Sequence, residues 1–292
     1  MAWLSKILAP VDFSPRCRGA IRYAEWLAGR SQGELFLLHA VAPLPAMFAS
    51  PEAMAYATVG EFNDERIEQR RMDLATYLEG HDAGFSVTRE AVEGDPALAI
   101  VSYAHDLTCD LIVMATHGYG PFRRFLLGSV TAKVLHDAHC PVWTGPHLES
   151  APESGAIQFR RILCAVDLST SSVAVLEWAE NFARYFGAGL AVIHVLPESL
   201  IRVGGVYFDP EWRVEAAGTA RQQIERLRSG HDPTADVMVE FGDAPSAVAT
   251  LARSWHADLL VIGRGGETGM LGRLRANAYA ILRESPCPVV AV

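Results

Sequence analysis

The sequence has no long hydrophobic run and few cysteines. Nowhere do about eighteen apolar residues follow one another, the minimum for a membrane-spanning helix, and the opening segment MAWLSKILAPVDFS is too polar for a signal peptide. The 5 cysteines form no Cys-x-x-Cys pair and are odd in number, which argues against a disulfide framework and fits a reducing compartment. We therefore expect a soluble, cytoplasmic protein that does not enter a membrane.

Positive charge is in deficit. Lysine and arginine total 25 against 34 aspartates and glutamates, which gives a net charge of −9 at pH 7. This balance disfavours general binding to DNA, RNA or anionic lipid, although a local basic loop can still meet a phosphate. A small anionic ligand is therefore a compatible partner, and a nucleic acid is not expected.

The residue constellations of common enzymes are also missing. The sequence has no P-loop Lys-Ser/Thr pair, no paired carboxylates at a recognisable site, and no Ser-His-Asp or Cys-His set whose members belong together. His136, His139 and Cys140 invite a metal site, but no fourth ligand is evident, and a polar helix end followed by a buried cysteine is the ordinary interpretation. We assign no catalytic residue and no metal ligand.

What the sequence does contain is an internal repeat. KILAPVD at residues 6–12 matches RILCAVD at residues 161–167, LLHAV matches VIHVL, EGDPALAI matches FGDAPSAV, and CDLIVMATHG matches ADLLVIGRGG. At 292 residues the chain is also longer than one hydrophobic core usually spans. We expect two copies of one domain, residues 1–147 and 159–292, joined by a polar linker at residues 148–158.

Within each copy, short apolar runs alternate with helical patterns, which is typical of βαβ units around a parallel sheet. In the first copy the expected strands lie at residues 6–11, 35–41, 85–92, 110–114 and 141–144. Ser14 should cap the first helix with Pro15 in its first turn, and Asp95 and Pro96 should open a later helix. The fold prediction is α/β, with two doubly wound, five-stranded parallel sheets of order 3-2-1-4-5, one per repeat.

Doubly wound sheets bind ligands beyond the carboxyl ends of the strands, where the winding reverses. Asp12 follows the first strand there, and the stretch ATHGYGPFRRFLLGS follows the fourth. Gly118 lets the backbone approach a ligand, and Gly128 and Ser129 start a helix whose free N–H groups favour an anion. A ribose hydroxyl or adenine amine at Asp12, with phosphate between Gly118 and Ser129, makes a coherent nucleotide pose.

The glycine pattern of this stretch resembles the universal stress protein family. The pattern is Gly-x-x-Gly, nine residues, then Gly-Ser, and it comes with an aspartate after the first strand and a Cys-Pro-Val segment at the end of each copy. The resemblance covers nearly the whole chain, twice, so the chain looks like a tandem universal stress protein. It implies a flavodoxin-like or Rossmann-like fold and membership of the ATP-binding branch of the family.

The resemblance implies a set of nucleotide contacts in the first copy. They are Pro10, Val11, Asp12, Val41, Met114, Ala115, Gly118, Tyr119, Gly128, Ser129 and Val130. Ala115 stands where the family pattern has its first glycine, and because alanine adds only a methyl group we expect weakened rather than lost binding. The implied ligand is ATP with Mg²⁺.

The second copy carries only part of the pattern. It keeps Asp167, Gly263 and Gly266, but it has Ala276 and Asn277 in place of Gly-Ser. Alanine crowds a phosphate that approaches the backbone, whereas Asn277 can still cap a helix. We interpret this copy as a degenerate, weaker site.

Several of these residues also have a purely structural interpretation. The glycine-rich stretch is then only a turn, and Asp12 and Asp167 are helix caps ahead of the following serines. His39 and His194 stand at matching positions at the ends of buried strands, which favours packed histidines hydrogen-bonded to the backbone.

The functional prediction is a nucleotide-dependent stress-response regulator or binding module. ATP would stabilise one conformation of the first copy, and an unidentified protein partner would read that surface. The long apolar connections APLPAMFASPEAMAYATVG and PESLIRVGGVYFDP are candidate lids or partner surfaces. The alternatives are a slow ATPase, for which no base can be nominated, and a scaffold or binder of another small ligand. By resemblance the apolar last strands pair the copies as an intramolecular pseudo-dimer, and a further homodimer stays open.

Overall fold

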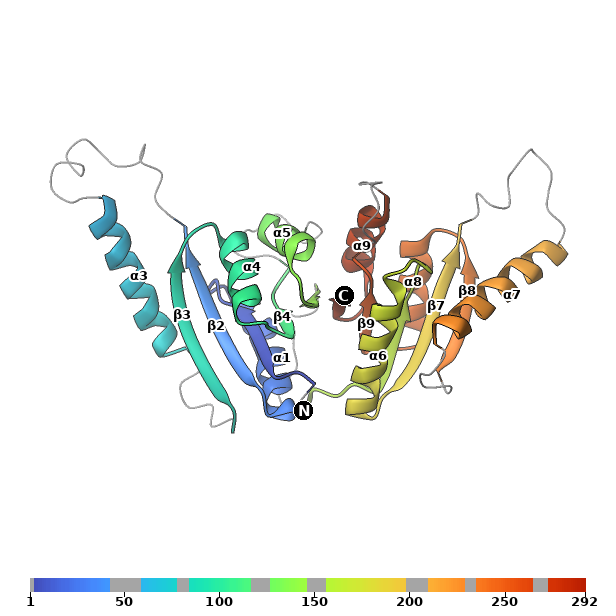
Figure 1. The fold of residues 1–292 in the computed structure, drawn as a ribbon, viewed down its shortest axis with the longest axis horizontal. Helices are drawn as coiled ribbons and strands as arrows, with labels where there is room; N and C mark the ends of the chain where they lie inside the picture. Colours follow the sequence, from blue (N-terminus) through green and yellow to red (C-terminus); the bar gives the residue numbers. More distant parts are fainter. Residues whose placement is uncertain are drawn as a thin grey trace. The chain divides into compact units, whose positions relative to one another are not determined.

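The computed structural model describes residues 3–42, 59–77, 84–116, 127–145, 156–197, 210–228, 235–264 and 273–292. The chain divides into two compact units, Met1–Val142 with Leu148–Ile157, and Trp143–His147 with Gln158–Val292. Each unit contains a parallel sheet flanked by helices (Figure 1). None of the helices in the described part of the chain is long and apolar enough to cross a bilayer.

The first unit alternates strands and helices along the chain. Its elements are β1 (Lys6–Pro10), α1 (Pro15–Ser31), β2 (Glu34–Val41), α3 (Val59–Ala75), β3 (Ser86–Glu93), α4 (Pro96–Asp106), β4 (Leu111–Val113) and α5 (Ser129–Asp137), followed by β5 (Val142–Thr144), in which the division between the two units falls. The strands follow the spatial order β3-β2-β1-β4-β5. β1 pairs in parallel with β2 and β4, and β2 pairs in parallel with β3. The predicted order 3-2-1-4-5 is confirmed.

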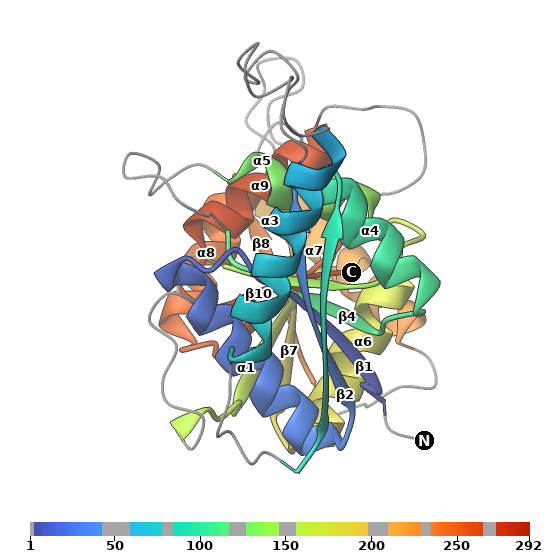
Figure 2. The same cartoon turned by 90° about the vertical axis from the view of Figure 1, so that its left-hand side faces the viewer.

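The winding of this unit reverses at β1. The chain moves from β1 through β2 to β3, then returns to β4 on the other side of β1 and continues to β5. Because parallel crossovers are right-handed, the two halves place their helices on opposite faces of the sheet, α1 and α3 on one and α4 and α5 on the other (Figures 1 and 2). The carboxyl ends of β1 and β4 therefore lie at the switch point where such sheets bind ligands.

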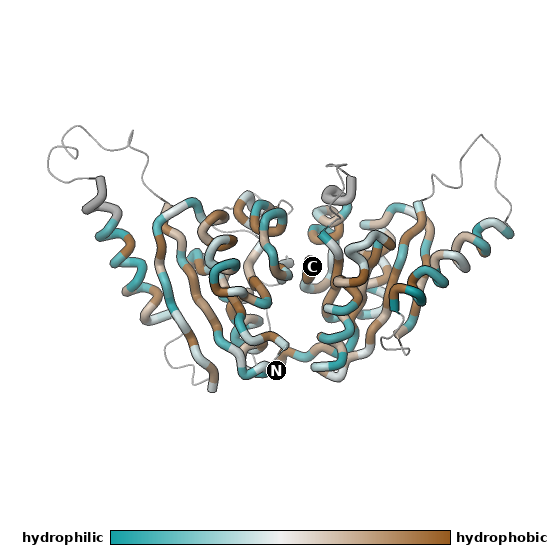
Figure 3. Tube along the Cα trace, viewed as in Figure 1, coloured by the Kyte–Doolittle hydropathy of each residue, from teal (hydrophilic) through white to brown (hydrophobic). Residues whose placement is uncertain are grey.

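The central strands β1 and β4 of the first unit are buried, whereas the edge strand β3 is mostly exposed or half-buried. Ile7, Leu8 and Ala9 of β1 and Leu111 and Ile112 of β4 have no exposed surface. A strand covered by helices on both faces carries a continuous apolar run instead of an alternating pattern. Figure 3 shows these hydrophobic stretches along the strands of both units.

Two helices of the first unit begin as the sequence predicts. At the start of α1, Ser14 accepts a hydrogen bond from the Cys17 amide at 3.2 Å, and Pro15 occupies the first turn. At the start of α4, the Asp95 side chain accepts from the Leu98 amide at 3.0 Å. Both caps satisfy amides that a helix leaves unpaired at its N-terminus.

The second unit repeats this arrangement. Its elements are β6 (Arg161–Ala165), α6 (Ser172–Phe186), β7 (Gly189–Leu196), α7 (Pro210–Leu227), β8 (Asp236–Phe241), α8 (Ala244–Ser254), β9 (Leu259–Ile262), α9 (Arg273–Glu284) and β10 (Val289–Ala291). Its strands follow the order β8-β7-β6-β9-β10, with parallel pairing of β6 to both β7 and β9. The repeat seen in the sequence is therefore a repeat of the fold.

Candidate functional site

A pocket opens at the carboxyl ends of β1, β2 and β4 in the first unit. Its volume is about 200 Å³. It is lined by Pro10, Val11, Asp12, Cys17, Leu38, His39, Ala40, Pro96, Ile100, Met114, Ala115, Val130 and Thr131. Many of the residues expected to contact a nucleotide are therefore brought together from three strands and the helices that follow them.

The other expected residues of the first unit fall outside this lining. Gly128 and Ser129 lie at the start of α5, immediately before the lining residue Val130. Val41 is buried at the end of β2 and is not part of the wall. Gly118 and Tyr119 lie outside the described residues.

Asp12 is held by a tight turn and does not cap a helix. Its Oδ1 accepts a hydrogen bond from the Ser14 amide at 2.9 Å, and Phe13 between them has a φ of 60°. Such a conformation costs a bulky residue about 1–3 kcal/mol. The Phe13 ring packs against His39 and Tyr77 at centroid distances of 4.9 and 5.6 Å, which helps to hold it in place. The turn keeps the half-buried Asp12 carboxylate in the pocket wall.

The thiol of Cys17 lies beside this carboxylate. Cys17 is 1% exposed, and its Sγ lies 3.4 Å from the carbonyl oxygen of Pro10. Burial, and after it the charge of Asp12, raises the pKa of Cys17 to about 12. The thiol is therefore protonated at neutral pH and acts as a weak hydrogen-bond donor, not as a nucleophile.

His39 presents an acceptor to the pocket. Its Nδ1 lies 2.6 Å from the carbonyl oxygen of Val11, and because a carbonyl only accepts, Nδ1 must carry the hydrogen. Burial lowers the pKa of His39 below its ordinary value of 6.5, so the ring is neutral and Nε2 is left as an acceptor. The predicted backbone-bonded histidine is confirmed here, and it also lines the pocket.

The first turn of α5 brings hydrogen-bond donors to the same place. Gly128 is its N-cap residue and makes no side-chain cap bond. The Thr131 hydroxyl donates to the carbonyl of Ala115 at 3.0 Å and ties the helix start to the end of β4. The first amides of a helix have no acceptor within it and carry the positive end of the helix dipole. This end of the pocket can therefore bind an anion.

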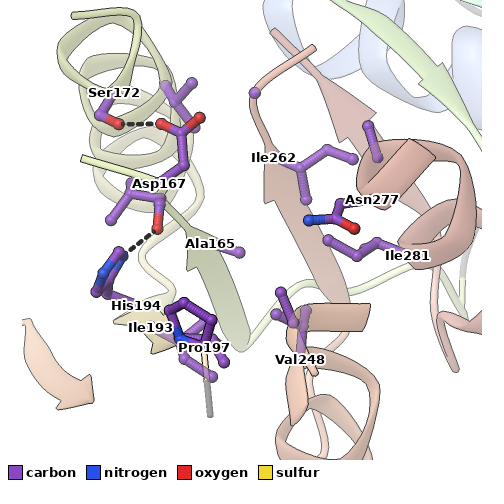
Figure 4. A pocket seen from close by; sticks show the side chains of 16 residues that line it. Ala165, Asp167, Ser172, Ile193, His194, Pro197, Val248, Ile262, Asn277 and Ile281 are labelled. Carbon is purple, nitrogen blue, oxygen red and sulfur yellow. Dashed lines mark hydrogen bonds between the residues drawn. The ribbon is translucent and has the colours of Figure 1, made fainter. Parts of the chain in front are cut away.

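The second unit has a matching pocket at the carboxyl ends of β6, β7 and β9 (Figure 4). Its volume is about 260 Å³. It is lined by Ala165, Val166, Asp167, Ser172, Val175, Ile193, His194, Val195, Pro197, Ala244, Val248, Ile262, Gly263, Asn277, Ala278 and Ile281. Asp167 and Gly263 of the expected weaker site thus line one cavity, and Gly266 lies outside the described residues.

Asp167 and His194 repeat the local geometry of the first unit. Asp167 Oδ1 accepts hydrogen bonds from the Ser169 amide at 2.9 Å and from the Ser172 hydroxyl at 3.0 Å. His194 Nδ1 lies 2.9 Å from the carbonyl oxygen of Val166, just after β6. Figure 4 marks this hydrogen bond with a dashed line. The backbone-bonded histidine predicted for this unit is confirmed as well.

One prediction for the second pocket is wrong, because Asn277 does not cap a helix. α9 begins at Arg273, four residues before Asn277, whereas α5 begins at Ser129, the counterpart of Asn277. Alanine, leucine and arginine are strong helix formers, so the run from Arg273 to Ala276 extends α9 where Gly128 stops α5. The amide of Asn277 is therefore inside the helix, where it is used by the carbonyl four residues back.

The histidines considered as metal ligands have other neighbours. His136 Nδ1 is bonded to the carboxylate of Asp137, and the ring of His139 lies 5.1 Å from that of His105. Cys140 is buried. Across the described ranges, no group of three or more His, Cys, Asp and Glu side chains is placed to hold a metal ion.

The sequence reasoning missed several residues of the first pocket. Cys17, Pro96 and Thr131 come from the first turns of α1, α4 and α5. Their position in a first turn could have identified them, because side chains of a helix tilt toward its N-terminus and those of a first turn reach back toward the preceding strand end. This criterion selects positions in the sequence and not a particular residue type.

The chain was compared with known proteins. Residues 4–144 and 158–292 each match the model of the universal stress protein family. The chain is 28% identical over 296 residues to a universal stress protein of Mycolicibacterium smegmatis, covering 98% of this chain and 96% of that one. A solved universal stress protein from Archaeoglobus fulgidus is similar with a TM-score of 0.63 at 21% identity, over 98% of this chain and 95% of that one.

A shorter likeness covers about half of the chain. A universal stress protein from Archaeoglobus fulgidus, solved in complex with dAMP, is 23% identical with a TM-score of 0.33, over 46% of this chain and 98% of that one.

Proposed function

The chain belongs to the universal stress protein family, and from this premise we propose that its first unit binds an adenine nucleotide, ATP with Mg²⁺, and uses it as a conformational signal. One observation carries the proposal. Asp12 and the first turn of α5, through Val130 and Thr131, line one pocket. A nucleotide site needs an acceptor for the ribose hydroxyls or the adenine amine, and it needs hydrogen-bond donors for the phosphates.

The pocket suits the nucleoside part of the ligand. Its volume of about 200 Å³ is below the range of about 300–1,000 Å³ for whole-ligand sites, so the phosphates would extend beyond it. Asp12 and His39 Nε2 accept hydrogen bonds, which fits ribose hydroxyls or the adenine amine. Met114, Ile100 and Leu38 supply an apolar wall for the base.

The phosphates would extend toward the start of α5. The amides of Ser129 and Val130 and the stretch that contains Gly118 and Tyr119 would surround them. We assign Mg²⁺ to the triphosphate as its counterion and assign no side chain of this chain to it. No base for hydrolysis stands out among the lining residues, so binding and not turnover is the proposed function.

The proposed signal is a population shift. A ligand that contacts β1, β4 and α5 together favours the arrangement in which these three elements close on it. A protein partner would then read the surface of the nucleotide-bound first unit. The partner and the cell determine which stress this signal serves.

Calorimetric titration of the nucleotide-stripped chain with ATP and Mg²⁺ tests the proposal. We expect one site per chain, abolished by Gly128→Val, because Gly128 has an extended backbone that accepts valine while the new side chain blocks the approach of phosphate. The matched control is Ala276→Val at the counterpart position, which should leave the ATP site intact.

Two results would count against this function. Absence of heat in the wild-type chain would favour a scaffold with an empty first pocket. Equal loss of ATP binding in both variants would place the effect in stability and not in the site. Single-turnover phosphate release above the uncatalysed rate would instead point to slow ATP hydrolysis.

A further inference from the structure

The second unit holds a cavity that the proposed nucleotide site does not use. We propose that this pocket is a separate site for an uncharged ligand of nucleoside size, rich in hydrogen-bond donors, and that it rejects the phosphorylated forms of that ligand. The inference goes beyond the proposed function, which concerns the first unit.

The walls of the second pocket are apolar. Val175, Val248, Ile262 and Ile281 come from α6, α8, β9 and α9 and surround a space of about 260 Å³, larger than the first pocket (Figure 4). A preformed cavity lined by aliphatic side chains with a few polar groups is the usual form of a small-molecule site. These walls suit the faces of a flat ring.

The polar groups of this pocket are mainly acceptors. Both hydrogen bonds found for Asp167 within the described residues end on Oδ1, which leaves Oδ2 as an acceptor. His194 donates from Nδ1 to the backbone, and in this tautomer its Nε2 is an acceptor. Two acceptors on one cavity call for a ligand with amine or hydroxyl donors.

The donors that would bind phosphate are missing from this pocket. In the first unit the helix begins at Ser129, so its free amides lie beside the cavity; in the second unit α9 begins at Arg273, and the amides of Asn277 and Ala278 are consumed within the helix. Moving the helix start by four residues moves the positive end of its dipole by about 6 Å.

The lining charges of the two pockets are alike. Each has one aspartate, Asp12 in the first and Asp167 in the second, and neither has a lysine or an arginine among its described lining residues. The free amides at the helix start are therefore the feature that separates the two pockets in their binding of an anion.

The test uses the full chain with the first pocket filled. Val130→Phe places a large ring on the half-buried first turn of α5, and Ala278→Phe does the same at the counterpart position in the second unit. The Val130→Phe chain is titrated by calorimetry with adenosine, AMP and ATP. We expect one adenosine per chain, with AMP and ATP bound at least about tenfold more weakly, since their phosphates must lose water without gaining free amides at the start of α9.

Two variants assign the effect to the second pocket. Ala278→Phe added to Val130→Phe should abolish adenosine binding. Asp167→Asn should weaken adenosine binding, because it removes the charge of an acceptor and replaces one carboxylate oxygen with an amide donor. Circular dichroism of each variant checks that it is folded.

Three results would overturn the inference. They are AMP or ATP binding to the Val130→Phe chain as tightly as adenosine, adenosine binding that survives Ala278→Phe, and no adenosine binding to a folded Val130→Phe chain. None of these depends on whether ATP occupies the first unit, because the first pocket is filled throughout.

Discussion

The residue after each pocket aspartate adopts a left-handed backbone conformation, with a φ of 60° at Phe13 and 61° at Leu168. Glycine would relieve this strain in both units but would lose the side chain. The Phe13 ring contacts His39, Tyr77 and the guanidinium of Arg70, whereas Leu168 has no aromatic ring with which to make such contacts. The two positions therefore share a conformation and differ in what stabilises it.

This difference predicts unequal costs of substitution. We expect Phe13→Gly to lower the free energy of unfolding by about 2 kcal/mol, because lost aromatic packing exceeds the relieved strain. Leu168→Gly should change it by less than about 1 kcal/mol, because relieved strain and added backbone entropy nearly cancel. Urea unfolding of both variants measures the difference, and equal losses would show that the ring contacts do not hold the turn.

His39 predicts a pH dependence of stability. Its pKa is lowered in the folded chain by burial, so the unfolded chain takes up a proton at higher pH than the folded chain does. His39 therefore does not reduce the free energy of unfolding at a pH above its ordinary pKa of 6.5, and the free energy of unfolding falls as the pH drops below that value. The lowered pKa values of Asp73 and Asp95, caused by hydrogen bonds, act in a more acid window, below 3.8.

The measurement is urea unfolding of wild type and His39→Gln at pH 7 and at pH 5. Wild type should lose more stability across this interval than the variant, which lacks the titrating ring. An identical loss in both chains would mean that His39 does not contribute to it.

At the scale of elements, the start of the last helix in each unit decides what its pocket can bind. The sequence predicted the start of α5 correctly, because Gly128 and Ser129 interrupt the helix-forming pattern. The start of α9 was predicted wrongly, because Asn277 is a favourable cap residue but the helix-forming run before it extends the helix. The amides that are free at the second pocket therefore depend on the propensity of the whole run and not on one residue.

Restoring the glycine should move this boundary. We expect Ala276→Gly with Asn277→Ser to shorten α9 at its start and to raise the affinity of the second pocket for AMP about tenfold, since first-turn amides become free for phosphate. Asn277→Ser alone keeps the helix-forming Ala276 and is the control. Hydrogen exchange at residues 276–278 reports the boundary, and calorimetry reports the affinity. Slow exchange at these amides in the double variant would contradict the mechanism.

The strands were the most predictable elements. The central strands carry continuous apolar runs because helices cover both faces, and the repeat shows each of these runs twice. The pocket lining was less predictable, because it depends on how the first turns of α1, α4 and α5 lean over the strand ends. Cys17 and Thr131 reach the pocket in this way, and neither belongs to a motif that the sequence displays.

At the scale of the whole molecule, two units with one topology have pockets of different chemistry. Periodicity and repetition predicted the fold class, and the strand order was expected from that class. The family followed from the resemblance of the glycine pattern to universal stress proteins. The ligand of each pocket could not be predicted from the sequence in the same way, because it depends on which amides are free and which carboxylate oxygens are already bonded. Those facts are set by a few residues per unit.

Two separate sites predict additive protection of the full chain. A ligand that binds only the folded state stabilises it by about 2.7 kcal/mol at 100 times its Kd. We expect saturating ATP and adenosine together to raise the melting temperature more than either does alone at saturation. Thermal unfolding of wild type, Val130→Phe and Ala278→Phe would check this, and a mixture no better than the stronger single ligand would indicate one shared site.

With the two proposed sites, the four-residue difference between the starts of α5 and α9 would make the duplicated chain a differential sensor. With a phosphorylated compound in one unit and its dephosphorylated form in the other, the pattern of occupancy reports the ratio of the two. A ratio is insensitive to changes in the total pool that affect both forms equally. A receptor with two identical copies could report only the amount.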